Sequence, residues 1–153
     1  MTIRKMWQPA AAAVAGVSLL VLAGCSGEDS EDAKVRSVVT GFFSDLADGD
    51  GAACDVLTGN ATRLASLLAA SANAPATCPD SVKVLSGQLS SDEKEALKNA
   101  KVNRTTISGD QATINPSDVE FLLNGQSQLL SSVRAGPTQL IKVDGGWKIN
   151  SLG

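Results

Sequence analysis

Three cysteines, Cys25, Cys54 and Cys78, are the residues of this chain with the most evident chemistry. The chain contains no histidine and no tyrosine. Histidine is the commonest general base, the commonest metal ligand and the usual partner of a serine or cysteine nucleophile. The sequence therefore predicts no hydrolytic triad and no histidine metal site, and it indicates no cofactor.

Ser91 and Lys94 have the Ser-x-x-Lys spacing of penicillin-recognising enzymes, in which the lysine helps to activate the serine. Those enzymes also carry Ser-Asp-Asn and Lys-Thr-Gly elements, and neither occurs here. Ser90 and Glu93 have the spacing of a capping box, which marks the first turn of a helix. We therefore interpret this stretch as the start of a helix and assign it no catalysis.

Cys25 follows a segment that is typical of a secretory signal peptide. Arg4 and Lys5 precede an apolar run over residues 10–22, and small residues come next. The run is shorter than the ~20 residues that a helix needs to cross a bilayer. The residues Leu22-Ala23-Gly24-Cys25 resemble the lipobox of bacterial lipoproteins.

This resemblance implies that residues 1–24 are removed and that Cys25 becomes a lipidated N-terminus carrying acyl chains such as palmitate. A single acyl chain holds a protein only marginally at a membrane, so two or three are needed for stable attachment. We therefore expect an anchor on the outer, extracytoplasmic face of the cell membrane. The alternative is an unmodified cysteine beside an ordinary secretory cleavage site.

Loss of the signal peptide makes the remaining chain more acidic. It removes Arg4 and Lys5 and no acid, so the net charge changes from −3 to −5. Residues 25–32 are small, polar and acidic, and we expect them to form a flexible tether ahead of a single domain over residues 33–153. An acidic surface with 3% aromatic residues disfavours nucleic acid as a partner.

Once Cys25 is assigned to lipid, Cys54 and Cys78 remain in an oxidising compartment, and we expect a disulfide between them. Such a bond closes a loop of about 25 residues and contributes roughly 3.5 kcal/mol to stability on the chain-entropy model. The alternatives are two free thiols or a redox pair. The spacing is far from Cys-x-x-Cys, and no basic neighbour in sequence lowers a thiol pKa, so both alternatives are less favoured.

The first half of the domain has the period of helices. Apolar residues at helical spacing predict a helix from Ala33 that ends at Gly49-Asp50-Gly51; they are Val35, Val38, Val39, Phe42, Phe43 and Leu46. Shorter helices are expected over residues 51–57, from Asn60 through Leu64, Leu67 and Leu68, after Cys78-Pro79-Asp80, and from Ser90 to about Ala100.

The second half has the period of strands. Hairpins are predicted for Val102–Ile107 with Gln111–Ile114, and for Leu140–Val143 with Trp147–Ile149. Residues 115–136 are ambiguous, because Asn124-Gly125 is a hairpin signal whereas Leu129-Leu130 also suits a helix. Helices followed by strands predict an α+β domain.

The leading amphipathic helix, the Cys54/Cys78 pair, the stretch from Thr106 to Ile114 and the closing Val143–Ile149 resemble small exported proteins of the NTF2-like (cystatin-like) kind, common as lipoproteins in actinobacteria. The resemblance implies helices packed in the concave face of a curved antiparallel sheet, which together form a cone. Trp147, Phe42 and Phe43 are then expected in the core or lining the cone. Enzymes of that kind use an Asp or His base with polar, often Tyr, partners, so the resemblance carries over the fold and not catalysis.

We therefore expect a membrane-anchored, non-enzymatic domain that binds a partner protein or a small apolar ligand. One alternative is an enzyme of the cyclase or isomerase type with one buried carboxylate, for which Asp118 and Glu120 are the candidates. Another is a structural subunit of an envelope complex.

Overall fold

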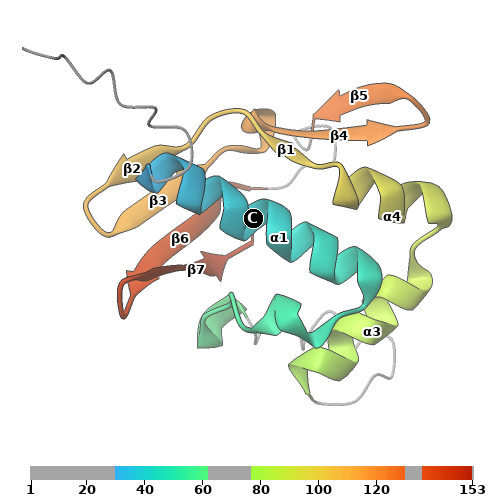
Figure 1. Ribbon diagram of the computed structural model, residues 1–153, viewed down its shortest axis with the longest axis horizontal. Helices are drawn as coiled ribbons and strands as arrows, with labels where there is room; N and C mark the ends of the chain where they lie inside the picture. The colour runs from blue at the N-terminus through green and yellow to red at the C-terminus, as the bar shows by residue number, and fades with distance from the viewer. Residues whose placement is uncertain (1–29, 62–76, 130–135, 153) are drawn as a thin grey trace, which may run out of the picture.

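The computed structural model describes residues 30–61, 77–129 and 136–152. Helices precede antiparallel strands along the chain, which confirms the predicted α+β class (Figure 1). The elements are α1 (Glu31–Asp48), the 3-10 turn η1 (Gly51–Cys54), α3 (Cys78–Gln88), α4 (Ser91–Lys98), β1 (Lys101–Val102), β2 (Thr106–Ser108), β3 (Gln111–Ile114), the 3-10 turn η2 (Pro116–Asp118), β4 (Val119–Leu123), β5 (Gln126–Leu129), β6 (Thr138–Val143) and β7 (Gly146–Ser151).

Helix α1 is the predicted amphipathic helix, and it begins two residues earlier than expected. The Ser30 side chain accepts a hydrogen bond from the backbone N–H of Ala33 at 3.1 Å, which is an N-cap, and Glu31 and Asp32 follow in the first turn. The tether predicted to reach Asp32 is therefore too long by at least these three residues. The helix ends at Gly49, whose φ of +71° is the left-handed conformation of a C-cap.

The helix predicted over residues 51–57 is wrong beyond its first turn. Only Gly51–Cys54 forms a 3-10 turn, because the chain then bonds to β7. The Ile149 N–H donates to the Val56 carbonyl at 2.7 Å, and the Thr58 N–H donates to the Ile149 carbonyl at 2.8 Å. Competition from a strand edge thus ends the helix. The next expected helix, with Leu64, Leu67 and Leu68, lies outside the described residues.

The capping box at the start of α4 is confirmed. The Ser90 side chain accepts from the Glu93 N–H, and the Glu93 carboxylate accepts from the Ser90 N–H. Thr77 caps α3 in a similar way. Both helices pack against α1 in the half that leads to its C-terminal end (Figure 1).

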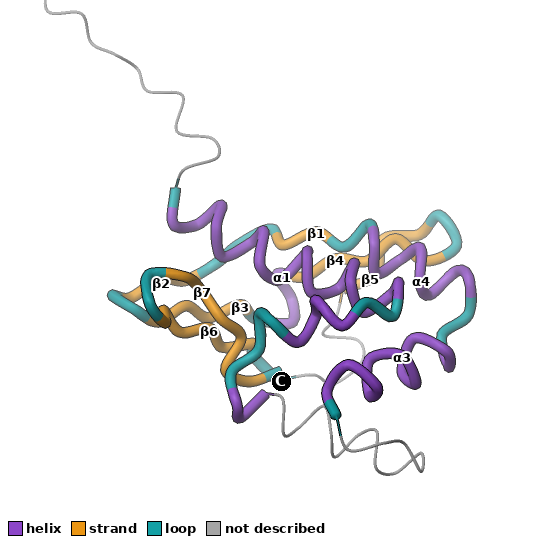
Figure 2. Tube along the Cα trace, turned by 60° about the horizontal axis from the view of Figure 1, so that its bottom comes forward, coloured by secondary structure: helices purple, strands orange, loops and turns teal. Residues whose placement is uncertain are grey.

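The strands form two antiparallel sheets, with the orders β1-β4-β5 and β2-β3-β6-β7. The two sheets are joined by one long hairpin, with β1 and β2 on one arm and β3 and β4 on the other. Thr106 lies opposite Thr113, and Val102 lies opposite Val119. The first arm therefore advances four residues between these two pairs while the second arm advances six. The two extra residues fall at η2, where Pro116 has no N–H to donate. This bulge bends the hairpin, and the two sheets diverge from it (Figure 2).

Two tight turns confirm the hairpin signals of the sequence. Asn124 and Gly125, with φ of 51° and 73°, connect β4 to β5, and Asp144 and Gly145, with φ of 50° and 82°, connect β6 to β7. Positive φ at both positions is the type I′ geometry that Asn-Gly and Asp-Gly favour. The ambiguous stretch is thus a hairpin as far as Leu129; Leu130 lies outside the described residues.

The core lies between α1 and the strands. The largest side chains buried there come from β3, β6 and β7 on one side and from α1 and α3 on the other. The members with under 2% exposure include Ile114, Leu140, Ile149, Val35 and Val39. The buried hydroxyl of Ser86 donates to the Ala47 carbonyl at 2.8 Å, which satisfies an otherwise unpaired group at the C-terminal end of α1.

Candidate functional site

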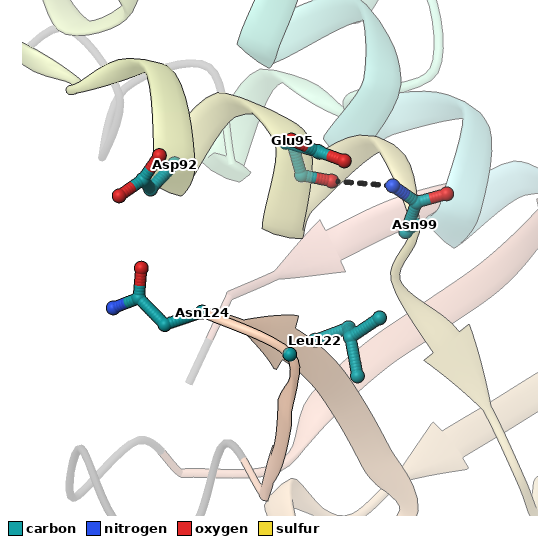
Figure 3. A pocket seen from close by; sticks show the side chains of 6 residues that line it. Asp92, Glu95, Asn99, Leu122 and Asn124 are labelled. Atoms are coloured by element: carbon teal, nitrogen blue, oxygen red, sulfur yellow. Dashed lines mark hydrogen bonds between the residues drawn. The ribbon is translucent and has the colours of Figure 1, made fainter.

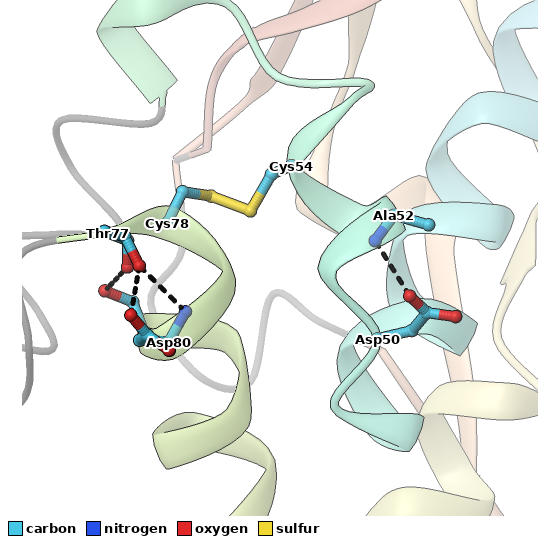
Figure 4. The surroundings of a disulfide bond; sticks show 7 residues. Asp50, Ala52, Cys54, Thr77, Cys78 and Asp80 are labelled. Carbon is cyan, nitrogen blue, oxygen red and sulfur yellow. Dashed lines mark hydrogen bonds between the residues drawn. A yellow bond between two sulfur atoms is a disulfide. The ribbon is translucent and has the colours of Figure 1, made fainter.

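The predicted Cys54–Cys78 disulfide is present. Its Cα atoms are 6.1 Å apart, and it joins η1 to the first turn of α3 (Figure 4). The bond holds these elements in contact, as the nearness of Gly51 to Pro79 also indicates. Cys25 and the lipobox residues Leu22, Ala23 and Gly24 lie outside the described residues.

The three aromatic residues expected around a cone lie in the core. The Phe42 and Phe43 ring centroids are 5.7 Å apart, and Phe43 meets Phe121 of β4 edge-on at 5.4 Å. Trp147 of β7 is 5% exposed. Trp147 also borders a hollow of about 350 Å³ between the first turns of α1 and the β6–β7 turn, which Lys34, Ser37 and Val38 line on the helix side.

A charged network at the start of α1 holds the Trp147 side chain. The Glu31 carboxylate accepts from Trp147 Nε1 at 2.7 Å and from Lys142 Nζ at 2.9 Å, and it accepts from Lys34 Nζ at 3.1 Å. The Lys142 ammonium also lies 5.6 Å from the centroid of the Trp147 ring, which is a cation–π contact. The hydrogen bonds from Lys142, Lys34 and Trp147 lower the pKa of Glu31 to about 2.

A second hollow, of about 200 Å³, lies between α4 and the β4–β5 hairpin (Figure 3). We call it the Leu122 hollow; it is lined by Asp92, Glu95, Asn99, Leu122, Asn124 and Gly125. Leu122 is 50% exposed, and it is the exposed large apolar residue among those whose burial the structure describes. The Asn99 side-chain amide donates to the Glu95 carbonyl at 3.0 Å and so stays at the rim.

The candidate acids of the enzymatic alternative lie close together near η2. Asp118 accepts from the Asn115 side-chain amide at 3.2 Å, and Glu120 accepts from the Asn103 side-chain amide at 3.2 Å. Both carboxylates are half-buried, and both of these hydrogen bonds are at the surface. Neither residue lines the hollow beside Trp147 or the Leu122 hollow.

Among the carboxyl groups that the structure describes, Asp45 has a raised pKa. Partial burial on α1 is the main cause, and the negative charges of Asp50 and Asp48 add to it. A raised pKa is a trait of catalytic acids, but Asp45 borders neither hollow. The described residues contain no group of three or more His, Cys, Asp or Glu side chains that fits a metal ion.

Sequence reasoning missed two of these residues. Glu31 was assigned to the tether, although Ser30 followed by two acids is a recognisable helix start. Leu122 falls in the stretch that the sequence leaves ambiguous. However, Val119, Phe121 and Leu123 alternate as the inward residues of a strand do, and this pattern places Leu122 on the opposite face. No helix of the described residues is long and apolar enough to cross a membrane.

Comparisons with known proteins find no protein-family model and no curated protein that matches this chain. Among solved structures it is similar to a Campylobacter jejuni protein with the provisional description of NTF2-like transpeptidase, at 16% identity and a TM-score of 0.46, over 75% of this chain and 95% of that one. A likeness of this degree carries no argument about the fold or the activity of this chain.

Proposed function

We propose that this chain is a lipoprotein anchored on the outer face of the cell membrane, and that its domain binds a partner protein without catalysing a reaction. Two features support the location. Cys25 follows a signal-like segment in a lipobox-like motif, and a Cys54–Cys78 disulfide suits an exported, oxidising setting.

The anchor would fix one end of the domain near the bilayer. Five residue steps separate Cys25 from Ser30, and an extended chain spans at most ~3.6 Å per residue, so the start of α1 would lie within roughly 18 Å of the lipidated cysteine. Helix α1 has 18 residues and is therefore ~27 Å long. The β4–β5 hairpin and α4 lie toward the other end of the molecule (Figure 1), where a partner has access.

The Leu122 hollow is the observation that carries the binding role. Leu122 offers apolar surface for a partner to cover, and the carboxylates at its rim would pair with basic side chains of that partner. A small apolar ligand would instead need an enclosed pocket that buries most of its surface. Both hollows described above are open to solvent, which favours the protein partner.

A fractionation and crosslinking experiment on whole cells tests this proposal. The native chain and its Cys25→Ser variant are compared, with a membrane-impermeant, lysine-reactive crosslinker added before lysis. We expect the native chain in the membrane fraction, the variant outside it, and one crosslinked species of constant mass with the native chain. Substrate turnover by the purified protein that is lost in Asp118→Asn or Glu120→Gln would contradict the proposal and favour the enzymatic alternative.

A further inference from the structure

We propose that the Leu122 hollow receives a segment of the partner protein in which a lysine or arginine stands next to an apolar residue. This inference rests on the proposed function and specifies the chemistry of the partner. It follows from the positions of the acidic side chains on α4, from their lack of ionic partners and from the single exposed leucine facing them.

The acidic wall of the hollow is one face of α4. Asp92, Glu95 and Asn99 are spaced three and four residues apart, so their side chains lie along one stripe of the helix. The opposite wall is the end of β4 and its turn, with Leu122, Asn124 and Gly125. Figure 3 shows Asp92 on the side of Asn124 and Glu95 above Leu122, so carboxylate and apolar surface share the opening.

The two carboxylates of the hollow have no ionic partner among the described residues. Three described acids do have one: Glu31 pairs with Lys34 and Lys142, Asp32 with Arg36, and Asp48 with Lys98; other exposed acids, Asp110 among them, form no ion pair with the described residues. No lysine or arginine is among the described residues that line the hollow. Its charge is therefore negative and uncompensated, which is complementary to a basic side chain.

Helix stability explains one of these acids and leaves the other unexplained. Asp92 is in the first turn of α4, where a negative charge stabilises the positive end of the helix dipole. Glu95 is in the last turn, where the dipole disfavours a carboxylate, and its neighbour at three residues' distance is another acid. Lys98, which belongs to the same turn, pairs with Asp48 of α1 and leaves Glu95 free.

A basic side chain of a protein fits this combination better than a simple ion. Lysine and arginine have an aliphatic stem that packs against apolar surface and a charged head that pairs with carboxylates. A stem on Leu122 and a head between Asp92 and Glu95 would use both walls of the hollow. An apolar neighbour in the same segment would cover the rest of the exposed Leu122 surface.

The test is an amide-shift titration of the lipidated full chain in detergent micelles. Three synthetic heptapeptides serve as probes: Gly-Ser-Leu-Arg-Leu-Ser-Gly, the same peptide with Glu for Arg, and the same peptide with Ser for both Leu. We expect the first to shift amides of α4 and the β4–β5 hairpin, and the other two to bind at least about tenfold more weakly.

Variants of the chain localise the effect. Glu95→Lys and Leu122→Ser are each expected to weaken binding of the arginine peptide by about tenfold or more, and their spectra report whether the fold is intact. Asp110→Lys is the matched control, because Asp110 is an exposed carboxylate in the β2–β3 turn away from the hollow. It should leave binding unchanged.

Three results would overturn the inference: no shifts at millimolar peptide, shifts centred elsewhere, or equal weakening by Asp110→Lys. The whole-cell crosslinked species separates these failures from failure of the proposed function. If that species persists in Glu95→Lys and Leu122→Ser, the domain binds its partner through another surface and the proposed function stands.

Discussion

Glu31 is the residue that joins the start of the domain to its last hairpin. Its carboxylate bonds to Trp147, Lys142 and Lys34, which favour the charged form and lower its pKa from 4.5 to about 2. A lowered pKa in the folded state adds stability above the unfolded pKa, and this stability is lost as pH falls through the folded value. The Glu31 contribution should therefore be complete above about pH 4.5 and disappear toward pH 2.

We predict that Glu31→Gln lowers stability at neutral pH and that its difference from the native chain shrinks between pH 4.5 and pH 2. Urea unfolding at several pH values, followed by tryptophan fluorescence, measures this. In a chain that begins at Cys25, Trp147 is the single tryptophan, and it lies in the network itself. A difference that is independent of pH would show that the charge of Glu31 is not what stabilises the fold.

Ser86 makes the buried polar contact between α3 and the end of α1. Its hydroxyl donates to the Ala47 carbonyl, and Ser86→Ala would leave that carbonyl without this donor. We predict a loss of about 1–2 kcal/mol in the free energy of unfolding. Ser108→Ala, at an exposed position of β2, is the control and should change stability by less than about 0.5 kcal/mol. Equal effects of the two substitutions would contradict this role of Ser86.

At the scale of elements, the sequence predicted those whose signals are local. The period of α1, the Ser90–Glu93 capping box and the Asn124-Gly125 and Asp144-Gly145 turns each depend on neighbours in the chain. The prediction failed where a distant segment decided the outcome. Residues after Cys54 leave the helical path because Ile149, far along the sequence, takes their backbone hydrogen bonds.

The same limit applies to the candidate site. The disulfide was predictable, because the sequence predicts export, and the two cysteines that remain after Cys25 allow one intramolecular pair. The Leu122 hollow was not, because it needs α4 and the β4–β5 turn to meet, and no local pattern places a helix against a hairpin. In the sequence, Pro116 indicates only that a strand is interrupted. The bend that it causes depends on how β1 pairs with β4 and β2 with β3, which the sequence does not specify.

The Cys54–Cys78 bond constrains η1 against α3, and these elements contact each other and α1. We predict that replacing both cysteines by serine lowers the free energy of unfolding by roughly 2–4 kcal/mol, because the unfolded chain regains the freedom of a long loop. Urea unfolding of the variant and of the reduced native chain should give similar midpoints. A native chain whose midpoint is unchanged by reduction would contradict this prediction.

At the scale of the whole molecule, the net negative charge of the domain is consistent with attachment through a covalent lipid anchor. The chain from Cys25 onward has a net charge of −5, so the domain is not drawn onto anionic lipid by its overall charge and would depend on its covalent anchor to stay at the membrane. Its anchor would be at the start of α1, while α4 and the β4–β5 hairpin, which form the walls of the Leu122 hollow, lie toward the other end (Figure 1). This arrangement would present an acidic, partly apolar surface to proteins beyond the lipid headgroups.

The most direct test of the anchored, disulfide-bonded domain is the intact mass of the protein isolated from its own membranes, measured before and after reduction. We predict the mass of the chain from Cys25 onward plus acyl groups, with a gain of two hydrogen atoms on reduction of the Cys54–Cys78 bond. A mass without acyl groups, or one that retains residues before Cys25, would contradict the anchor. A mass unchanged by reduction would contradict the disulfide.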